Sequence, residues 1–425
     1  MLTETFAVKN SKKLKQQLLT WASRFSSCSF LDNHHYDSAW NLEECLVAAG
    51  AKCILKFHEN TEVESIQSFI DDHRGEWIFG HFGYEFKNIL EGISGDKSGK
   101  ESFAPIHLYV PEYLVQFKDG SAIIHSNGKA PILVWKEINT IELASDAKSV
   151  IQVPQPCITK NEYLETVRKL KDHIHRGDCY EINFCQEFTC IVPEFSPVVS
   201  YARLAEISPN PFSCFYHVNH GHLLCASPER FLARRGNKIF SQPIKGTAAR
   251  NENDADDKTS LRLLLESPKE RSENVMVVDL VRNDLSRVCA EGTVNVEELY
   301  GIYSYPQVHQ MISTISGQLA DGISFMDIMK ACFPMASMTG APKTRVIQLV
   351  SEYEKTTRGL FSGTVGYIAP SGDFDWNVVI RSLFYNAETC LLSYWVGSGI
   401  TWYSDPEQEY EECLLKASAI KKVLQ

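Results

Sequence analysis

The sequence predicts an α+β protein with large, mostly antiparallel sheets surrounded by helices. Residues 160–175 carry apolar side chains at helical spacing. Residues 180–240 instead contain short alternating runs typical of strands, such as 212–218 and 231–233. Helices and strands follow one another without the regular strand–helix–strand rhythm of a doubly wound parallel sheet, and this mixture favours the α+β class.

The chain is long enough for more than one domain-sized unit. Its 425 residues are 44% apolar, so a large core can be buried, and the length alone suggests about two or three units. The composition shifts at residues 152–156, Gln-Val-Pro-Gln-Pro, which we interpret as a linker. We therefore predict an N-terminal region over residues 1–150 that contributes to the sheets, and a catalytic domain over residues 157–425.

Charge and hydropathy argue against several kinds of partner. The formal net charge is −11, whereas nucleic acids and anionic membranes are bound by basic surfaces. No run of 18 apolar residues exists, and the polar, lysine-rich residues 1–23 predict a surface helix rather than a signal peptide. The 13 cysteines form no Cys-x-x-Cys pair, which favours reduced thiols. We expect a cytoplasmic protein with no nucleic-acid or membrane partner.

The pentapeptide 243–247, Pro-Ile-Lys-Gly-Thr, sets a lysine between a stiff apolar pair and a glycine. Pro243 and Ile244 favour an extended, water-poor approach, and Gly246 leaves room for a ligand or another backbone. Because lost hydration penalises an ammonium ion, the free amine of Lys245 would become a usable nucleophile. The alternative is a lysine at a strand end that reaches water past a turn.

Two predicted helices each begin with inward-facing carboxylates. Their starts are marked by the Ser-Pro pair 267–268 and the Asp-Pro pair 405–406, which have the form of an N-cap followed by proline. Acids in a first turn are also favoured by the helix dipole, and one of them can be the capping partner of Ser267. Carboxylates on an apolar stripe, however, need a cation, and an all-oxygen ligand set favours Mg²⁺. The four candidate ligands are Glu270, Glu273, Glu409 and Glu412.

Several cationic and glycine residues near the C-terminus are suited to an anionic ligand. In a predicted strand over 376–385, Arg381 shares a face with apolar residues, so it can bind a carboxylate or form a buried Arg–Glu pair. Gly397 and Gly399 follow a predicted strand and can form an anion nest or an ordinary turn. Lys416 follows on the next helix.

Two single residues are candidate proton-transfer groups. His309 occupies a strand-like position, where a hydrogen-bonded core histidine is the alternative to a catalytic one. Glu229 follows a proline and precedes a strand, so it is either a general acid with a raised pKa or an ion-pair partner of Arg230.

Together these residues resemble the chorismate-utilising enzymes, the family of the anthranilate, aminodeoxychorismate, isochorismate and salicylate synthases. The resemblance covers roughly residues 157–425 and depends on signatures that are specific only as a set. It implies the fold of anthranilate synthase component I, a two-lobed sandwich of large sheets. The signatures are Gly177–Asn183, Ser227–Phe231, Asp279–Asp284, Thr339–Lys343 and Gly397–Ile400.

Within the family, the lysine of the pentapeptide is similar to that of aminodeoxychorismate synthases, because anthranilate synthases typically have alanine there. The resemblance implies that Lys245 attacks C2 of chorismate while Glu229 protonates the departing 4-hydroxyl, with His309 beside the ring. Ammonia would then add at C4 and expel the lysine, giving 4-amino-4-deoxychorismate for para-aminobenzoate and folate synthesis. Isochorismate and salicylate synthases activate water with a lysine where this chain has Glu181, so water-based chemistry is disfavoured.

The resemblance also implies a metal, a partner and a substrate-binding set. In this family a glutamine amidotransferase supplies ammonia, and nothing in the sequence resembles that domain, so we expect a separate subunit. Segments 30–33 and 211–213 occupy regions that bind tryptophan in relatives, without the usual feedback residues. The implied Mg²⁺ ligands are Glu273, Glu409 and Glu412 with Glu270 nearby, and the predicted substrate-binding residues are Gly246, Thr247, Tyr367, Arg381, Gly397, Gly399 and Lys416.

Two other functions stay open at this point. Anthranilate synthase component I has the same fold and metal, and it would add ammonia directly without a lysine adduct. A non-catalytic subunit that binds chorismate is the third possibility, and it would be expected to lack metal ligands.

Overall fold

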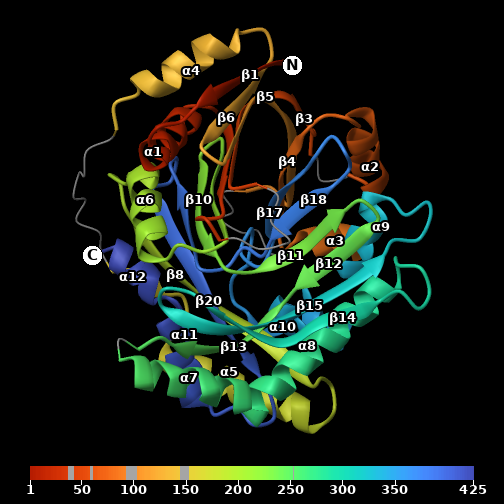
Figure 1. The fold of residues 1–425 in the computed structure, drawn as a ribbon. Coiled ribbons are helices and arrows are strands. Elements are labelled where there is room, and N and C mark those ends of the chain that lie inside the picture. Colours follow the sequence, from red (N-terminus) through yellow and green to blue (C-terminus); the bar gives the residue numbers. More distant parts are fainter. Residues whose placement is uncertain (37–42, 58–60, 92–102, 144–152, 252) are drawn as a thin grey trace.

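The computed structural model describes residues 1–36, 43–57, 61–91, 103–143, 153–251 and 253–425, and it confirms the α+β class. The described residues form one 20-stranded sheet system in which every pairing is antiparallel, with helices on its outer faces (Figure 1). The sheet branches at β5 (Ile106–Lys118), which pairs with different strands along its length.

The first arm of the sheet leads from β5 through β3, β2, β9, β10, β19 and β20 to β8. These strands are β3 (Cys45–Ile54), β2 (Ser27–Asp32), β9 (Phe212–Val218), β10 (Gly221–Ser227), β19 (Ser382–Asn386), β20 (Leu391–Ile400) and β8 (Glu181–Ile191). Short strands β7 (Gln155–Pro156) and β16 (Gly340–Ala341) pair with β8, while β6 (Ser121–Ser126) and β1 (Leu2–Ala7) extend the sheet beyond β5.

The second arm leads from β5 through β4, β17, β18, β11 and β12 to β15, which also pairs with β13 and β14. These strands are β4 (Ile78–Phe82), β17 (Thr364–Ile368), β18 (Phe374–Asn377), β11 (Arg230–Arg235), β12 (Lys238–Gln242), β15 (Val308–Gln318), β13 (Ile244–Ala249) and β14 (Asn295–Ser304). The two arms therefore share a root at β5 and have separate ends, at β8 and at β13–β15.

Two of the places where the chain passes between the arms lie side by side: the first crossing, from β10 to β11, and the second crossing, from β18 to β19. Glu229 is on the first crossing, between β10 and β11, and its carbonyl accepts the N–H of Val378 on the second crossing at 3.0 Å. The strand predicted over 376–385 is therefore interrupted, because β18 ends and β19 begins on different arms. Arg381 has a left-handed φ of 51° at this turn, which the alternation of apolar residues did not indicate.

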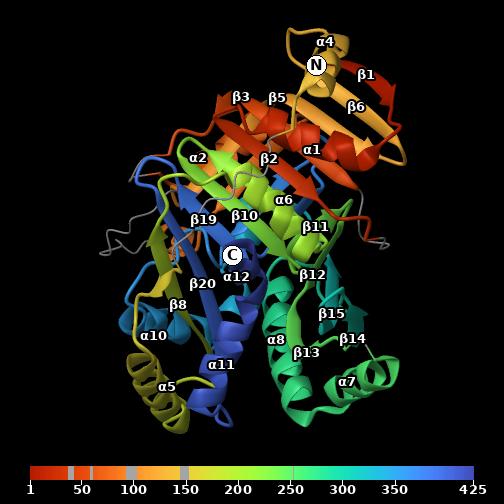
Figure 2. The same ribbon diagram turned by 90° about the vertical axis from the view of Figure 1, so that its left-hand side faces the viewer.

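Helices cover the outer faces of both arms, and the predicted helix over 160–175 is confirmed as α5. α8 packs on β13 and β15, whereas α11 packs on β20 and α5, and both lie in the lower half of the molecule in Figure 2. The helices are α1 (Ser11–Ala22), α2 (Val63–Asp72), α3 (Phe86–Glu91), α4 (Pro131–Thr140), α5 (Lys160–His175), α6 (Pro197–Ile207), α7 (Asp254–Glu266), α8 (Pro268–Ser286), α9 (Phe325–Cys332), α10 (Lys343–Tyr353), α11 (Pro406–Lys416) and α12 (Ser418–Val423).

Two hydrophobic cores hold the arms together, and each contains residues from both ends of the sequence. In one core Phe82 contacts Trp376, with ring centroids 5.3 Å apart. In the other core Phe30 contacts Tyr201 at 6.0 Å. The N-terminal region thus shares its apolar contacts with the rest of the chain, and the division between residues 150 and 157 stays a prediction; Gln152 of the linker lies outside the described residues.

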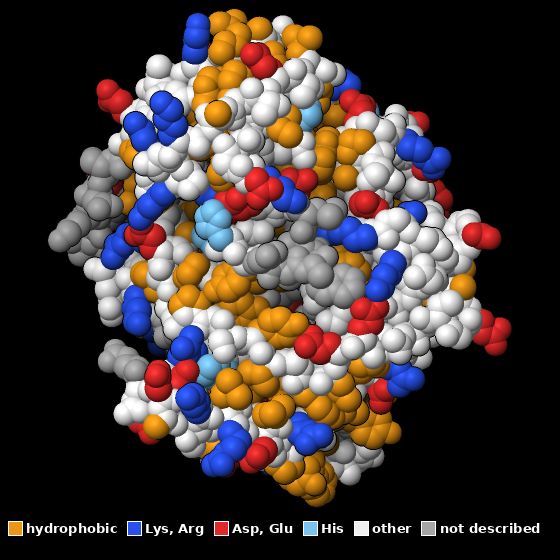
Figure 3. All heavy atoms as spheres, viewed as in Figure 1, with side chains coloured by type: hydrophobic (Ala, Val, Ile, Leu, Met, Phe, Trp, Pro, Cys, Tyr) orange, Lys and Arg blue, Asp and Glu red, His pale blue; other side chains and the backbone are white. Residues whose placement is uncertain are grey.

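The surface is polar and mixed in charge. On the face shown in Figure 3, basic and acidic side chains are scattered among one another rather than gathered in separate fields. None of the helices in the described part of the chain is long and apolar enough to span a membrane. All thirteen cysteines are free thiols, and most of them are buried.

Candidate active site

The two arms of the sheet meet at an ion pair between Lys245 and Glu181. Lys245 lies on β13 at the end of the second arm, and its ammonium contacts Oε1 of Glu181, the first residue of β8. Both side chains are buried, with 10% and 2% of their surfaces exposed. A Cβ on Gly399 of β20 would lie 2.9 Å from both charged atoms, so a glycine there leaves the space in which the pair forms.

Lys245 is held as an ammonium ion in this arrangement. Burial lowers the pKa of its amine, but Glu181 and then Glu273 raise it more, so the pKa lies above its ordinary value. The expectation that lost hydration alone would give a free amine is therefore wrong for the resting protein. Desolvation is present as predicted, but a neighbouring carboxylate outweighs it.

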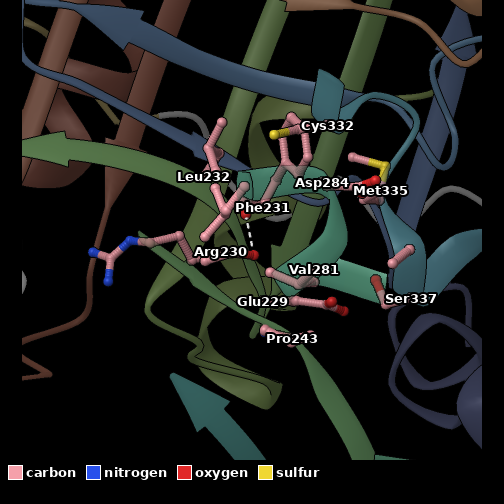
Figure 4. Close-up of a pocket in the computed structure, with 13 residues that line it drawn as sticks. Glu229, Arg230, Phe231, Leu232, Pro243, Val281, Asp284, Cys332, Met335 and Ser337 are labelled. Atoms are coloured by element: carbon pink, nitrogen blue, oxygen red, sulfur yellow. Dashed lines mark hydrogen bonds between the residues drawn. The ribbon is translucent and has the colours of Figure 1, made fainter. Parts of the chain in front are cut away.

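Glu229 has the properties of a general acid. Its side chain is buried, and burial raises the pKa of its carboxyl to about 7 despite the opposite effects of Ser337, the Ile244 backbone, Lys245 and Arg381. Figure 4 shows the carboxyl pointing toward Ser337, beside a small pocket with mostly apolar walls. A carboxyl with this pKa is partly protonated near neutral pH and can deliver a proton.

Arg381 lies on the second crossing with its guanidinium available for a ligand. Among the described residues, no side chain forms an ion pair or hydrogen bond with this guanidinium, and its charge acts on that of Glu229. The predicted alternative, a buried structural Arg–Glu pair, is instead found at Arg358 and Glu354, whose atoms approach to 2.6 Å.

The predicted acidic helices both form and converge on one cation. Ser267 and Asp405 cap α8 and α11 as expected, each accepting backbone N–H groups of the first turn. The ammonium of Lys269 lies 3.9 Å from Oε1 of Glu273 on α8 and 3.8 Å from Oε1 of Glu409 on α11. Glu273 Oε1 and Glu409 Oε2 are buried oxygens without a hydrogen-bond partner. Unsatisfied carboxylate oxygens around a shared positive charge fit a hard divalent cation.

The other two predicted ligands lie at the edges of this cluster. Glu270 makes no reciprocal capping box, because only its backbone N–H bonds to Ser267, at 3.3 Å. Its carboxylate lies against Gly246, where a Cβ would be 3.1 Å from Oε2. Glu412 is more exposed and pairs with Lys416 at 2.8 Å, which lowers its pKa. Within the described ranges no three His, Cys, Asp or Glu side chains form a group that could hold a metal ion.

The glycines of β20 do not form the predicted anion nest. The strand continues through Gly397 and Gly399 to Ile400 and is paired with β8 over this stretch. A nest requires a turn-like backbone, so this prediction is wrong. Instead, the Gly397 carbonyl accepts a hydrogen bond from Lys416 at 3.0 Å, which holds α11 against the strand.

His309 is fully engaged within the protein. It lies on β15 opposite Ala248, 1% exposed, with Nδ1 2.7 Å from Ser304 Oγ and Nε2 3.1 Å from Asp257 Oδ1. This geometry fits a hydrogen-bonded core histidine, which the sequence analysis gave as the alternative to a catalytic role. Thr247, two residues beyond Lys245, is exposed on β13.

Tyr367 lines a cavity whose walls do not include Lys245. It lies on β17 opposite Asp375 and lines a cavity of about 520 Å³ together with Asp32, Asn33 and Phe212. The prediction that Tyr367 lies in the site around Lys245 is therefore wrong, because β17 lies near the root of the second arm and not at its end. The segments that resemble effector regions, 30–33 and 211–213, do meet at this cavity.

Some residues of the site were not predicted from the sequence. Glu181 was noted only because isochorismate and salicylate synthases have a lysine at this position, and its contact with Lys245 was not predicted. Lys269 and Asn274 were also missed; the Asn274 amide donates to the Lys245 carbonyl at 3.4 Å. A glutamate beside the apolar residues Ile182 and Phe184 was the available signal for Glu181.

Known proteins are similar to this chain over most of its length. The chain is 31% identical over 357 residues to aminodeoxychorismate synthase component 1 of Escherichia coli, which covers 81% of this chain and 76% of the relative. It is 34% identical to the protein of the same name from Klebsiella aerogenes, over 80% of this chain and 75% of the relative.

Solved structures share the fold. Anthranilate synthase component I from Streptococcus pneumoniae superposes with a TM-score of 0.77 at 22% identity, covering 92% of this chain and 96% of that one. The menaquinone-specific isochorismate synthase from Escherichia coli gives 0.78 at 19% identity, covering 100% and 94%. These likenesses confirm the predicted fold.

The match to a family model settles the wider relationship. The model of the chorismate binding enzymes matches residues 26–422, which is nearly the whole chain and includes every residue of the Lys245–Glu181 junction. The resemblance inferred from the sequence signatures is thereby confirmed, and the chain belongs to the family of chorismate binding enzymes.

Proposed function

We propose that this chain converts chorismate and ammonia to 4-amino-4-deoxychorismate through a covalent adduct on Lys245. The single observation that carries the proposal is a buried lysine, Lys245, at the point where the two sheet arms meet. Its charge and that of Glu229 influence each other's pKa. Relatives named aminodeoxychorismate synthase component 1 support the same reaction.

The residues of the site have complementary roles in this reaction. Lys245 bonds to C2 of the ring while Glu229 gives its proton to the 4-hydroxyl, which leaves as water. Ammonia then bonds to C4, and the lysine leaves C2. Arg381 has free donors for a substrate carboxylate, and Gly246 keeps the backbone beside Lys245 open to the ring.

A magnesium ion is proposed at the acidic helices. Glu273 and Glu409 would hold it, with Glu270 and Glu412 at its margins, because Glu273 and Glu409 each have a buried oxygen without a hydrogen-bond partner and their carboxylates lie 3.9 and 3.8 Å from the ammonium of Lys269. When bound, the ion would neutralise a ring carboxylate of the substrate. The word "component" in the relatives' names suggests a second subunit, and we propose a glutamine amidotransferase that supplies ammonia.

The test uses the purified chain with chorismate, Mg²⁺ and ammonium, followed by chromatography of the products. The expected product is 4-amino-4-deoxychorismate, and Lys245→Ala should abolish it. Anthranilate as the only amination product, with activity retained in Lys245→Ala, would instead identify an anthranilate synthase. Failure to consume chorismate at all would favour a non-catalytic subunit.

A further inference from the structure

The proposed reaction requires a neutral amine, yet the structure holds Lys245 as an ammonium ion. A nitrogen with four bonds has no electron pair with which to attack carbon, so one proton must leave before the C2–N bond can form. The question is which group accepts it. The inference below depends on the proposed function and concerns the same site.

Glu181 is the group in contact with the proton. Its Oε1 accepts a hydrogen bond from Lys245 Nζ, and its Oε2 is buried without a hydrogen-bond partner. The Glu181 side chain is 2% exposed, so the contact lies almost entirely inside the protein.

The backbone around Glu181 is fixed from both sides. A Cβ on Gly340 of β16 would lie only 2.0 Å from the Glu181 carbonyl, so the two strands approach as closely as glycine allows. Two residues further along β8, the Asn183 carbonyl accepts a hydrogen bond from buried Arg358 at 2.8 Å. Glu354, the partner of that arginine, accepts the Cys185 N–H at 2.9 Å. This ion pair therefore orients the start of β8, which carries Glu181.

The other nearby carboxylates are unsuited to the task. Glu229 must already be protonated when the reaction starts, because it donates its proton to the departing 4-hydroxyl. It therefore cannot also accept a proton in the same step. Glu273 influences Lys245 through charge, but it forms no ion pair with Nζ within 4.0 Å. Among the described carboxylates, Glu181 alone pairs with Lys245.

We propose that Glu181 is a catalytic base that deprotonates Lys245 and later returns the proton. The proton moves from Nζ to Oε1, the freed electron pair forms the bond to C2, and the C4–O bond breaks as Glu229 supplies a proton to form water. When ammonia bonds to C4, the C2–N bond breaks and the amine recovers its proton from Glu181. The new C4 ammonium gives a proton to Glu229, so every group returns to its starting state.

The experiment measures formation of the Lys245 adduct directly. Protein, chorismate and Mg²⁺ are mixed without ammonia, quenched at intervals and analysed by mass spectrometry of the Lys245 peptide. We expect Glu181→Gln, which keeps the size but not the basicity, to slow the adduct by roughly 100-fold or more at pH 7.5. The rate in the variant should rise with pH as hydroxide replaces the base. Glu181→Asp should recover part of the rate, and Glu291→Gln, at an exposed loop position, should match the wild type.

The outcomes separate this inference from the proposed function. If the wild type forms the adduct and Glu181→Gln forms it as fast, the base assignment is wrong while the adduct stands. If the wild type forms no adduct, the proposed function fails, and this inference fails with it.

A second measurement covers the case in which the variant does not fold. In the wild type, competitive acetylation of Lys245 across pH reports the pKa of its amine. Burial and the charge of Lys416 on α11 lower this pKa, whereas Glu181 on β8, Glu273 on α8 and Glu229 on the first crossing raise it. A reactive amine that titrates at or below an ordinary lysine would overturn the assignment.

Discussion

Glu229 should make the protein less stable at neutral pH than a neutral residue in its place. Its carboxyl is buried among apolar walls, and burial is the largest influence on its pKa, which rises from 4.5 to about 7. Ionising this group in the folded protein therefore costs free energy that the unfolded chain does not pay. Replacing it by glutamine, Glu229→Gln, keeps the shape and removes the titration.

The size and sign of the effect follow from the two pKa values. A folded-state pKa raised above the unfolded value means that the folded protein binds the proton more tightly, so stability is lost as the pH rises from 4.5. The loss grows until the pH passes the folded pKa of about 7 and then levels off. A shift of this size corresponds to on the order of 3 kcal/mol. Glu229→Gln should thus be more stable than the wild type at pH 8 and close to it at pH 4.5.

Urea unfolding of both proteins at several pH values, in chelator and without substrate, measures this difference. The difference in free energy of unfolding should increase between pH 4.5 and 7 and stay constant above, while amination falls by about 100-fold or more because the general acid is lost. Glu291→Gln, on the exposed surface, should show no pH-dependent difference. A difference that stays flat from pH 4.5 to 8 for Glu229→Gln would mean that the buried carboxyl titrates normally, and the argument for a general acid would fail.

Three further changes test other parts of the site. Glu273→Gln or Glu409→Gln should abolish the rise in melting temperature that Mg²⁺ with chorismate gives the wild type, and an undiminished rise would exclude these ligands. Arg358→Met should lower the free energy of unfolding in urea by about 3–5 kcal/mol, because it leaves Glu354 buried without its arginine partner. The double variant Arg358→Met, Glu354→Leu should lose less stability, and equal losses in the two variants would contradict this account. Gly340→Ala should lower the melting temperature sharply, since its Cβ would lie 2.0 Å from a carbonyl oxygen, and an unchanged value would refute that close contact.

Features set by neighbouring residues were predictable from the sequence. Ser267 and Asp405 cap their helices because a side-chain oxygen two or three positions before a free N–H can reach it in any tertiary context. The helical stripe then fixes which side of each helix the acids occupy. Glu273 and Glu409 were accordingly identified as inward-facing residues, and the structure places both beside Lys269.

Features set by distant residues were not predictable in this way. The protonation of Lys245 depends on Glu181, which is 64 positions away and on the other arm of the sheet. The strand predicted over 376–385 is interrupted at Arg381 because β18 and β19 belong to different arms of the sheet, although the alternation of apolar residues continues across this turn. Gly397 and Gly399 were read as a turn from composition, whereas their pairing with β8 keeps them extended. In each case the deciding neighbour is one that the local sequence does not contain.

The charge balance of the site explains why a cation would control substrate binding. The four inward acids Glu270, Glu273, Glu409 and Glu412 are balanced by two helix cations, Lys269 and Lys416, and Lys245 is already paired with Glu181. Without a metal, the junction therefore carries excess negative charge and repels a dicarboxylate, as does the net charge of the whole chain. A divalent ion held by the acidic helices would reverse the local sign, and Arg381 on the second crossing, which has no partner among the described side chains, would add a second positive charge. A dianion can then be held between the two, with its ring beside Lys245.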